Sequence, residues 1–422
     1  MIPALLLILA LLGTPLFIVI AASALYGFHQ GEIDLSVVII EIYRLVETPV
    51  LVAIPLFTLA GYLLSHTQAS SRLVNLVDAL FGWLPGGLAL VALAACAMFT
   101  ALTGASGVTI IALGALLYPA LIKGGYAERF SLGLITSSGS LGLLFPPSIA
   151  LILYGVIVQQ VGVGAPVSID ELFVAGIAPG LLMLLLLGSW CVFHSPAMEK
   201  KPSDWQTIRK AVYLARWEIP IPFVVLGGIY GGVLAISEAA AALLLYVLVV
   251  SLFVLREIRP RQLSEIMHEA MVLIGGVLII LAVSLASTNY MVDAQIPQKL
   301  LAFVREYVDS KLTFLILLNL FLLMLGMMLD IFSALVIIVP LILPMAVSYG
   351  VHPVHLGIIF LANMQIGYFT PPVGMNLFIA SFRFNRPVME LYRASIPFMF
   401  IMMLAVLIIT YWPTLSLFAI SQ

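Results

Sequence analysis

Charged residues are scarce in this chain, and their scarcity excludes an ordinary soluble domain. Asp, Glu, Lys and Arg make up 9% of the 422 residues, whereas about 25% is usual in soluble domains. Hydrophobic residues make up 63%, and the mean hydropathy is +1.19. This composition predicts a polytopic membrane protein, and the net charge of −2 indicates no particular partner.

Other absences narrow the class further. The apolar segments lack the alternation of a transmembrane barrel and run over about 20 residues, so the predicted fold class is all-α. No basic region precedes the apolar residues 1–20, which favours a retained first helix over a cleaved signal peptide. The two cysteines, Cys96 and Cys191, have no metal-binding or redox spacing. The sequence has no nucleotide-binding loop and no intramembrane Ser/His, paired-Asp or metal-binding constellation, so we expect neither an ATP-driven pump nor an enzyme.

Two double prolines stand out among the residues that are present. Pro146-Pro147 and Pro371-Pro372 each lie inside an apolar segment long enough to cross a membrane. Proline lacks a backbone N–H and disfavours helical geometry in the preceding residue, so each segment should break near the middle of the membrane. Unwound backbone is tolerated at that depth only where it is buried in protein or lines a wet cavity, which is where transporters bind ions and substrates.

The two breaks belong to an internal repeat. Five residues of the first half recur 225 positions later without a gap: Pro119 and Pro344, Gly125 and Gly350, Gly142 and Gly367, Pro146 and Pro371, and Pro147 and Pro372. An odd helix near residues 219–230 lies between the halves, so the second half should enter the membrane from the opposite side. We therefore predict two inverted-topology repeats, an arrangement that gives inward-facing and outward-facing states similar energies.

Each repeat should contain scaffold helices, a re-entrant helical hairpin and a proline-broken transmembrane helix. Small and polar residues mark the first hairpin tip at 103–107, and the same offset places the second tip around Gly326, Asp330 and Ser333. The predicted domains are 1–84 (scaffold, first repeat), 85–160 (hairpin 1 and broken helix 1), 161–218 (a span and a cytoplasmic linker), 219–311 (scaffold, second repeat), 312–388 (hairpin 2 and broken helix 2) and 389–422 (C-terminal span). Residues 85–160 and 312–388 together form the predicted transport domain.

Basic residues give the expected orientation. The polar connection 195–217 carries five Lys and Arg residues, and a second basic cluster follows at 256–261, after a down-and-back pair of helices. Excess Lys and Arg marks the cytoplasmic side of a membrane protein. Counting spans from these clusters places the N-terminus in the cytoplasm and the C-terminus in the periplasm.

Several motifs, in order, resemble the DctM-like large membrane subunit of TRAP transporters, the tripartite ATP-independent periplasmic systems of the ion transporter superfamily. The resemblance covers essentially the whole chain. The motifs are Gly104-Ala105-Ser106-Gly107, Leu144-Phe145-Pro146-Pro147-Ser148, Ser237-Glu238-Ala239-Ala240-Ala241, Pro297-Gln298, Gly326-Met327-Met328-Leu329-Asp330 and the run from Ile366 to Leu377. One departure is Ala235-Ile236-Ser237-Glu238, where the family often has Thr-Pro-Thr-Glu, so we assign no site role to that stretch.

This resemblance implies an elevator-type secondary transporter of the bacterial inner membrane. It would import an organic acid, such as a C4-dicarboxylate, a sialic acid or another sugar acid, together with two or more sodium ions and without an organic cofactor. Two partners are implied outside this chain: a soluble periplasmic substrate-binding protein and a small four-helix membrane subunit. The alternative is a standalone sodium- or proton-coupled dicarboxylate or citrate carrier of the same superfamily, which would need no binding protein.

Candidate site residues follow from the resemblance, residue by residue. The first sodium site would comprise Thr103, Gly104, Ser106, Ser138 and Gly139, and the second Gly326, Asp330, Gly367 and Thr370. Ser148 and Asn376, just beyond the two breaks, are candidates to contact the substrate carboxylate. Ser and Thr in membrane helices most often serve packing, but their clustering at repeat-related breaks favours sites. Asp330 is an ionisable residue inside a predicted span, which is by default functional, and its alternative role is a helix cap.

Overall fold

The computed structural model describes residues 8–9, 14–46, 48–196, 205–418 and 420, and over these ranges the chain is helical without strands. Seven of the described helices are long and apolar enough to cross a membrane, or up to nine if each of two bent pairs counts as one span. The predicted all-α class is therefore confirmed over the described residues. The apolar residues 1–20, expected to form a retained first helix, fall partly outside these ranges, because residues 1–7 and 10–13 are not described.

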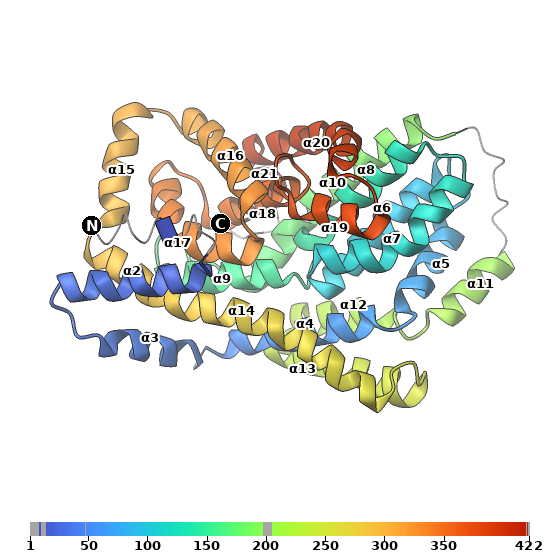
Figure 1. Ribbon diagram of the computed structural model, residues 1–422, viewed down its shortest axis with the longest axis horizontal. Helices are drawn as coiled ribbons and strands as arrows, with labels where there is room; N and C mark the ends of the chain where they lie inside the picture. The colour runs from blue at the N-terminus through green and yellow to red at the C-terminus, as the bar shows by residue number, and fades with distance from the viewer. Residues whose placement is uncertain (1–7, 10–13, 47, 197–204, 419, 421–422) are drawn as a thin grey trace.

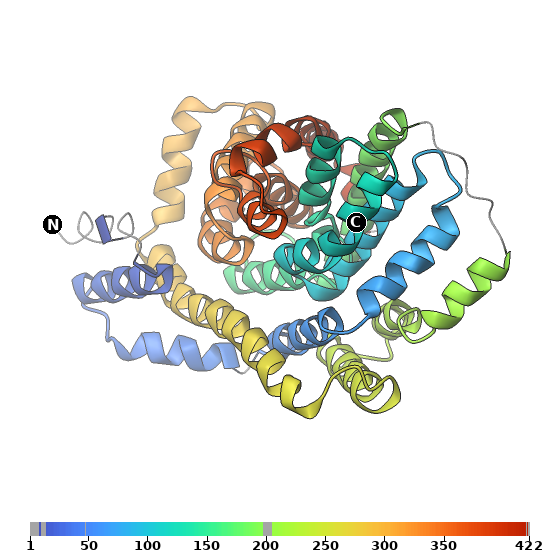
Figure 2. The ribbon, with the colours of Figure 1, turned by 45° about the vertical axis from the view of Figure 1, so that its right-hand side comes forward.

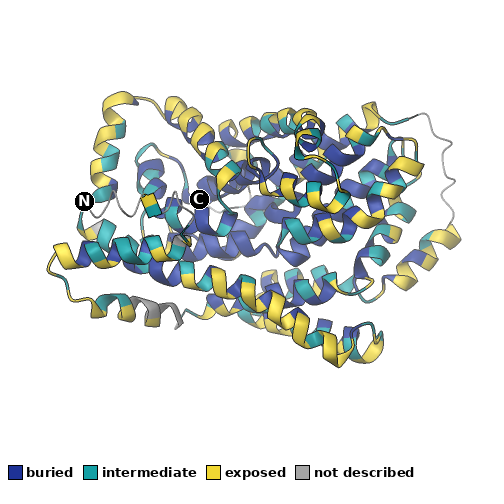
Figure 3. Cartoon of the chain, in the orientation of Figure 1, coloured by how far each residue is buried: buried dark blue, intermediate teal, exposed yellow. Residues whose placement is uncertain are grey.

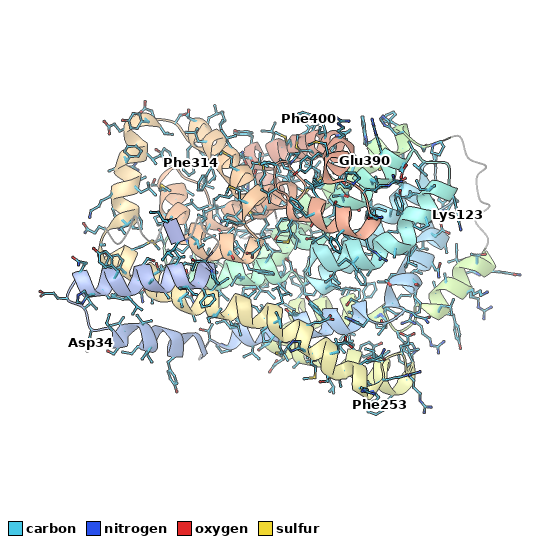
Figure 4. The ribbon with its side chains drawn as sticks, viewed as in Figure 1. Asp34, Lys123, Phe253, Phe314, Glu390 and Phe400 are labelled. Carbon is cyan, nitrogen blue, oxygen red and sulfur yellow. The ribbon has the colours of Figure 1, made fainter. Side chains whose placement is uncertain are left out.

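One layer of the molecule is built from long scaffold helices, which run along the lower side of Figure 1. The central helix is α14 (Pro260–Asp293), yellow in Figure 1, and it packs against α2, α3 and α4. The layer comprises α2 (Leu16–Gln30), α3 (Ser36–Val46), η1 (Pro49–Val52), α4 (Ala53–Ser65), α12 (Pro220–Tyr230), α13 (Ile236–Val249) with the π-helical turn η3 (Val250–Val254), and α14. Asp34 and Phe253, labelled in Figure 4, lie at outer ends of this layer.

The second part is a thicker body above that layer, and it contains the two hairpins and the two broken helices (Figure 1). The first half supplies α6 (Gly87–Thr103), α7 (Ser106–Lys123), α8 (Glu128–Ser138), η2 (Leu141–Leu144), α9 (Ile149–Val161) and α10 (Ile169–Phe193). The second half supplies α16 (Lys311–Met328), α17 (Ile331–Ser348), α18 (Pro353–Gly367), α19 (Met375–Phe384), α20 (Val388–Tyr411) and α21 (Thr414–Leu417).

The broken helices form the centre of this body. All fifteen residues of α18 are buried, and so are the first ten of α9, Ile149 to Val158. Figure 3 shows this buried core between more exposed outer helices. Helices that are apolar on every side belong inside a membrane protein, and here they bring the two breaks into the middle of the body.

Two amphipathic helices connect the layer to the body at opposite ends (Figure 2). Helix α5 (Ala69–Phe81) follows α4 after a bend of 76° and packs on α6. Helix α15 (Ile296–Tyr307) follows α14 and packs on α17. We call α5 and α15 the arm helices.

Helix boundaries reproduce the sequence repeat. Helix α17 begins and ends 225 residues after α7, and α18 begins 225 residues after α8. Both double prolines interrupt helices: α8 and η2 meet α9 at a bend of 44° across Pro146-Pro147, and α18 gives way to α19 across Pro371-Pro372. In each pair, the peptide bond that joins the two prolines is cis. The predicted breaks are thus present, and each predicted hairpin corresponds to a pair of consecutive helices, α6 with α7 and α16 with α17.

Three elements differ from the sequence prediction. The polar linker 195–217 contains helix α11 (Trp205–Leu214), because its small Ala211, with Ala215 beyond its end, packs against Leu76 of α5. The apolar sequence predicts a span from Val272 to Tyr290, whereas helix α14 begins twelve residues earlier, since Ile266 and Ala270 are buried and extend its packed face. The arm helix α15 was not predicted, because twelve amphipathic residues are too few to register as a span.

Candidate functional site

The first hairpin tip is a two-residue turn between α6 and α7. Gly104 has φ +69°, a left-handed conformation that glycine adopts without strain, and its N–H donates to the Thr100 carbonyl at 2.7 Å. The hydroxyl of Thr103, one residue earlier, is buried and has no hydrogen-bond partner among the described residues. An unpaired buried oxygen at a turn of small residues is a free ligand for a hard cation.

This tip contacts the first break directly. The Thr100 hydroxyl donates to the carbonyl of Gly139 at 2.8 Å, and a Cβ atom on Gly139 would lie 3.4 Å from the Ser106 carbonyl oxygen. Ser138 instead bonds back to Ile135 of its own helix at 3.3 Å. The structure therefore brings Gly139 and the tip residues together, whereas the Ser138 hydroxyl points along α8.

The second hairpin tip meets the second break through two glycines. A Cβ atom on Gly367 would lie 2.5 Å from both Cα and the carbonyl carbon of Gly326, so only glycine permits this approach. The Gly374 N–H donates to the Met327 carbonyl at 3.0 Å, and the Ile331 N–H donates to the Tyr368 hydroxyl at 2.7 Å. These contacts hold the unwound segment 368–374 against the turn between α16 and α17.

Asp330 is the N-cap of α17. Its Oδ1 accepts from the N–H groups of Phe332 and Ser333, each at 3.0 Å, and its Oδ2 accepts from the Ser333 hydroxyl at 2.5 Å. The cap role considered from the sequence is therefore present. Because an ionised carboxylate offers about four lone-pair sites, the capped Asp330 retains capacity for one further ligand. The Thr370 hydroxyl donates to the Ile366 carbonyl at 2.7 Å and likewise keeps acceptor capacity.

The two halves are joined at their centre by a reciprocal contact. The Ser140 hydroxyl donates to the Gln365 carbonyl at 3.1 Å, and the Gln365 side-chain amide donates to the Ser140 carbonyl at 2.6 Å. These residues are 225 positions apart, so each is the repeat counterpart of the other. A reciprocal contact between equivalent positions is what a two-fold relation between the predicted repeats would produce, as in an isologous interface. The Oε1 atom of Gln365 is buried and unpaired among the described residues.

Asn376 makes a second link between the halves. Its Oδ1 accepts from the Ser106 hydroxyl at 2.8 Å, and its Nδ2 donates to the Thr136 carbonyl at 3.3 Å. It therefore lies within reach of the first hairpin tip and first broken helix. Ser148 occupies a different position: it is the N-cap of α9, where its Oγ accepts from the Leu151 N–H at 3.4 Å. Within the described chain, no hydrogen bond joins Ser148 to Asn376.

The sequence prediction missed the residues that tie these segments together. Thr100, Gln365 and Tyr368 are all buried and all bridge a break to another segment. One signal was available for Gln365, because the 225-residue offset pairs it with Ser140. Glu238, given no site role, accepts from the Ala235 N–H at 2.8 Å and so caps the start of α13.

Comparison with known proteins agrees with this architecture. Residues 3–415 match the family described as "Tripartite ATP-independent periplasmic transporter, DctM component". The C4-dicarboxylate TRAP transporter large permease protein DctM of Rhodobacter capsulatus is 33% identical over 98% of this chain and 96% of its own length. The ectoine TRAP transporter large permease protein TeaC of Halomonas elongata is 33% identical over 97% and 96%. The isethionate TRAP transporter permease protein DctMQ of Oleidesulfovibrio alaskensis is 33% identical over 96% of this chain, which spans 64% of that longer relative.

Solved structures support the fold alone. The YdaH transporter of Alcanivorax borkumensis superposes with a TM-score of 0.61 at 16% identity, covering 87% of this chain and 85% of its own. MtrF of Neisseria gonorrhoeae gives a TM-score of 0.54 at 12% identity, covering 86% and 80%. With the full-length family match and relatives of 33% identity, these findings show that the chain belongs to the DctM family, the large permease component of tripartite ATP-independent periplasmic transporters.

Proposed function

We propose that this chain imports an organic acid across the bacterial inner membrane, coupled to sodium, and receives it from a periplasmic binding protein. The observation that carries the proposal is the convergence of both hairpin tips and both breaks around buried polar groups. Thr100 joins the first tip to the first break, Gly326 and Gly367 join the second pair, and Ser140 with Gln365 joins the two breaks. Unwound backbone and small residues at such a crossing are suited to ions and a carboxylate.

The first sodium ion would bind at the tip of hairpin 1. The unpaired, buried Thr103 hydroxyl supports this site, with Gly104, Ser106 and Gly139 beside it. Ser138, also assigned to this site, donates its hydroxyl proton to the Ile135 carbonyl within α8 and, like Thr370, keeps oxygen lone pairs for an ion. Sodium is a hard cation, so hydroxyl and carbonyl oxygens are fitting ligands.

The second sodium ion would bind between Gly326, Asp330, Gly367 and Thr370. The close approach of the two glycines brings the backbones of the second hairpin tip and the second break together, and Asp330 supplies negative charge nearby. The two sites would therefore differ, since an acid stands beside only the second.

The substrate carboxylate would lie between the first turns of α9 and α19. Both helices begin immediately beyond the breaks, and helix N-termini favour anions through their free N–H groups and dipole. Asn376 and Ser148 stand at these N-termini. The cargoes named for three relatives, a C4-dicarboxylate, ectoine and isethionate, each carry an acid group, which agrees with an anion site.

Movement would follow an elevator mechanism between inverted repeats. The body that contains hairpins and breaks would slide against the scaffold layer, with arm helices α5 and α15 bending at opposite ends (Figure 2). The equal bounds of α7 and α17 after a 225-residue shift support two copies of one unit. The N-terminus would be cytoplasmic, the C-terminus periplasmic, and a small four-helix subunit would extend the scaffold.

Reconstitution tests the coupling and the partner requirement. The purified large and small subunits in liposomes should take up radiolabelled C4-dicarboxylate or sugar acid only with an inward sodium gradient and a loaded binding protein. A full uptake rate without the binding protein would favour the standalone carrier instead. Uptake driven equally by potassium would refute sodium coupling.

Two substitutions at Asp330 distinguish a role in ion binding from a role as helix cap. Asp330→Ala removes both charge and cap, whereas Asp330→Asn keeps a good N-cap and removes only the charge. We expect both variants to lose sodium-dependent uptake, and only the alanine variant to lose thermal stability as well, by about 1 kcal/mol. Normal uptake by the asparagine variant would make Asp330 a cap alone.

A further inference from the structure

Three charged side chains meet beside the first arm helix, and none of them belongs to the candidate ion sites. Arg72 of α5 donates from Nε to Oε1 of Glu218 at 2.8 Å, and its Nη2 lies 2.5 Å from the same oxygen. Arg72 also pairs with both oxygens of Glu257, which follows η3, and its Nη2 lies 3.2 Å from Oε2. The Gln68 N–H donates to that Oε2 at 3.0 Å. Phe253, labelled in Figure 4, marks the same corner of the molecule.

This cluster is short of one positive group. One guanidinium faces two carboxylates, so the cluster carries a formal negative charge in excess. The missing donor concerns Glu218. Its side chain is 3% exposed, and its Oε2 has no hydrogen-bond partner among the described residues. An unpaired buried carboxylate oxygen is costly, so a donor that completes Glu218 should bind there.

A cavity of about 360 Å³ is lined by Glu218 and otherwise by apolar residues. Its lining includes Leu76 of α5, Phe223 of α12, Met98 of α6 and Phe145 beside the first break. Among the described residues that line it, Glu218 alone is charged. Apolar cavities of this kind exclude water and accept apolar ligands. The occupant that fits is therefore amphiphilic, with a positive donor at one end and a hydrocarbon chain at the other.

The position of the cavity relative to the membrane identifies the class of ligand. Glu218 lies between the polar linker, with α11, and α12, whose Phe223 is 71% exposed on an apolar helix. The carboxylate is thus at headgroup depth, and the cavity runs from there toward the break at Phe145. We propose that this site binds a phospholipid with a primary amine headgroup, such as phosphatidylethanolamine, whose ammonium donates to Glu218 Oε2 and whose acyl chain enters the cavity.

Lipid in this cavity would touch both moving parts. Its walls combine the scaffold and arm helix α5 with α6 and the first break, which belong to the body. A bound acyl chain would therefore lie between the scaffold and the body, at the surface over which the body slides. This consequence rests on the elevator mechanism proposed above, whereas binding of the lipid does not, so the two can fail separately.

Competitive lipid retention tests the proposal without measuring transport. The purified protein is incubated with equal amounts of phosphatidylethanolamine and phosphatidylcholine of identical acyl chains, and the retained lipid is counted by native mass spectrometry. Choline keeps the positive charge but has no N–H to donate, so we expect about tenfold preference for the amine, the factor that 1.4 kcal/mol represents. Equal retention of the two lipids would overturn the proposal, and retention of neither would assign the site to water or to a partner side chain.

Substitutions in the two cavities test where the preferred lipid binds. Glu218→Gln should abolish the preference, while Arg72 keeps its pair with Glu257 and holds the fold together. Ala94→Leu, on the cavity wall, should reduce retention of both lipids. The matched control is a cavity of about 500 Å³ between α15, α16 and α17, lined without acidic residues: Leu317→Phe there should leave the lipid ratio unchanged. A preference that survives Glu218→Gln, or that follows Leu317→Phe instead, would refute the assignment.

Discussion

Replacing Gly367 by alanine should force the second break away from the second hairpin tip. The new Cβ would lie 2.5 Å from Cα and the carbonyl carbon of Gly326 and 2.9 Å from its oxygen, whereas carbon atoms pack best at about 3.5–4.0 Å. Backbone atoms cannot rotate away as the end of a side chain can. Overpacking of this kind costs about 2 kcal/mol in the free energy of unfolding, which is about a thirtyfold change in the equilibrium constant.

Two other glycines provide matched controls. A Cβ on Gly326 would lie 3.1 Å from Cα of Gly367, a milder overlap at the same contact. A Cβ on Gly275, within α14, would meet nothing within 4 Å, and alanine is favoured over glycine in a helix by about 0.5–1 kcal/mol. Thermal unfolding should therefore rank the variants Gly275→Ala, Gly326→Ala and Gly367→Ala from most to least stable.

The assay is thermal unfolding of the purified protein, followed by tryptophan fluorescence in sodium chloride and in choline chloride. Gly367→Ala should lower the melting temperature and also shrink the stabilisation by sodium, because the same backbone lines the second proposed ion site. The Gly275→Ala variant should retain the melting temperature of the parent and its stabilisation by sodium. A Gly367→Ala protein as stable as the parent, or a Gly326→Ala protein that is worse, would refute the close-approach argument.

Three further substitutions test single contacts. Tyr368→Phe leaves the buried Ile331 N–H unpaired and should cost about 1–3 kcal/mol in thermal unfolding, and no loss would mean that water replaces the hydroxyl. Gln365→Ala removes the 2.6 Å bond to the opposite break and should lower both the melting temperature and the uptake rate, which an ordinary packing residue would not do together. Arg386→Gln breaks the half-exposed pair with Glu128, whose charge raises the pKa of Arg386, and should scarcely change the melting temperature, since exposed ion pairs contribute little; a large, salt-independent loss would contradict this.

The sequence by itself determined the features that depend on local chemistry. Apolar runs too long for a soluble domain predicted membrane helices, and proline predicted the interruptions at Pro146 and Pro371 because it cannot donate a hydrogen bond. The 225-residue offset anticipated that α7 and α17 would have matching bounds. The ion ligands, the substrate residues, the domain boundaries and the membrane orientation stay predictions.

Only the tertiary structure decided which polar groups meet. In the sequence, Ser140 and Gln365 are two polar residues in apolar segments, and their reciprocal hydrogen bonds exist because packing places both breaks side by side. Asp330 was visible as an isolated acid, but its role as a cap depends on the turn that starts α17. Arg72 and Glu218 are 146 residues apart and belong to no predicted site, so their pairing could not be seen in the sequence. Hydrogen bonds and ion pairs between distant residues follow from packing, which the local sequence does not encode.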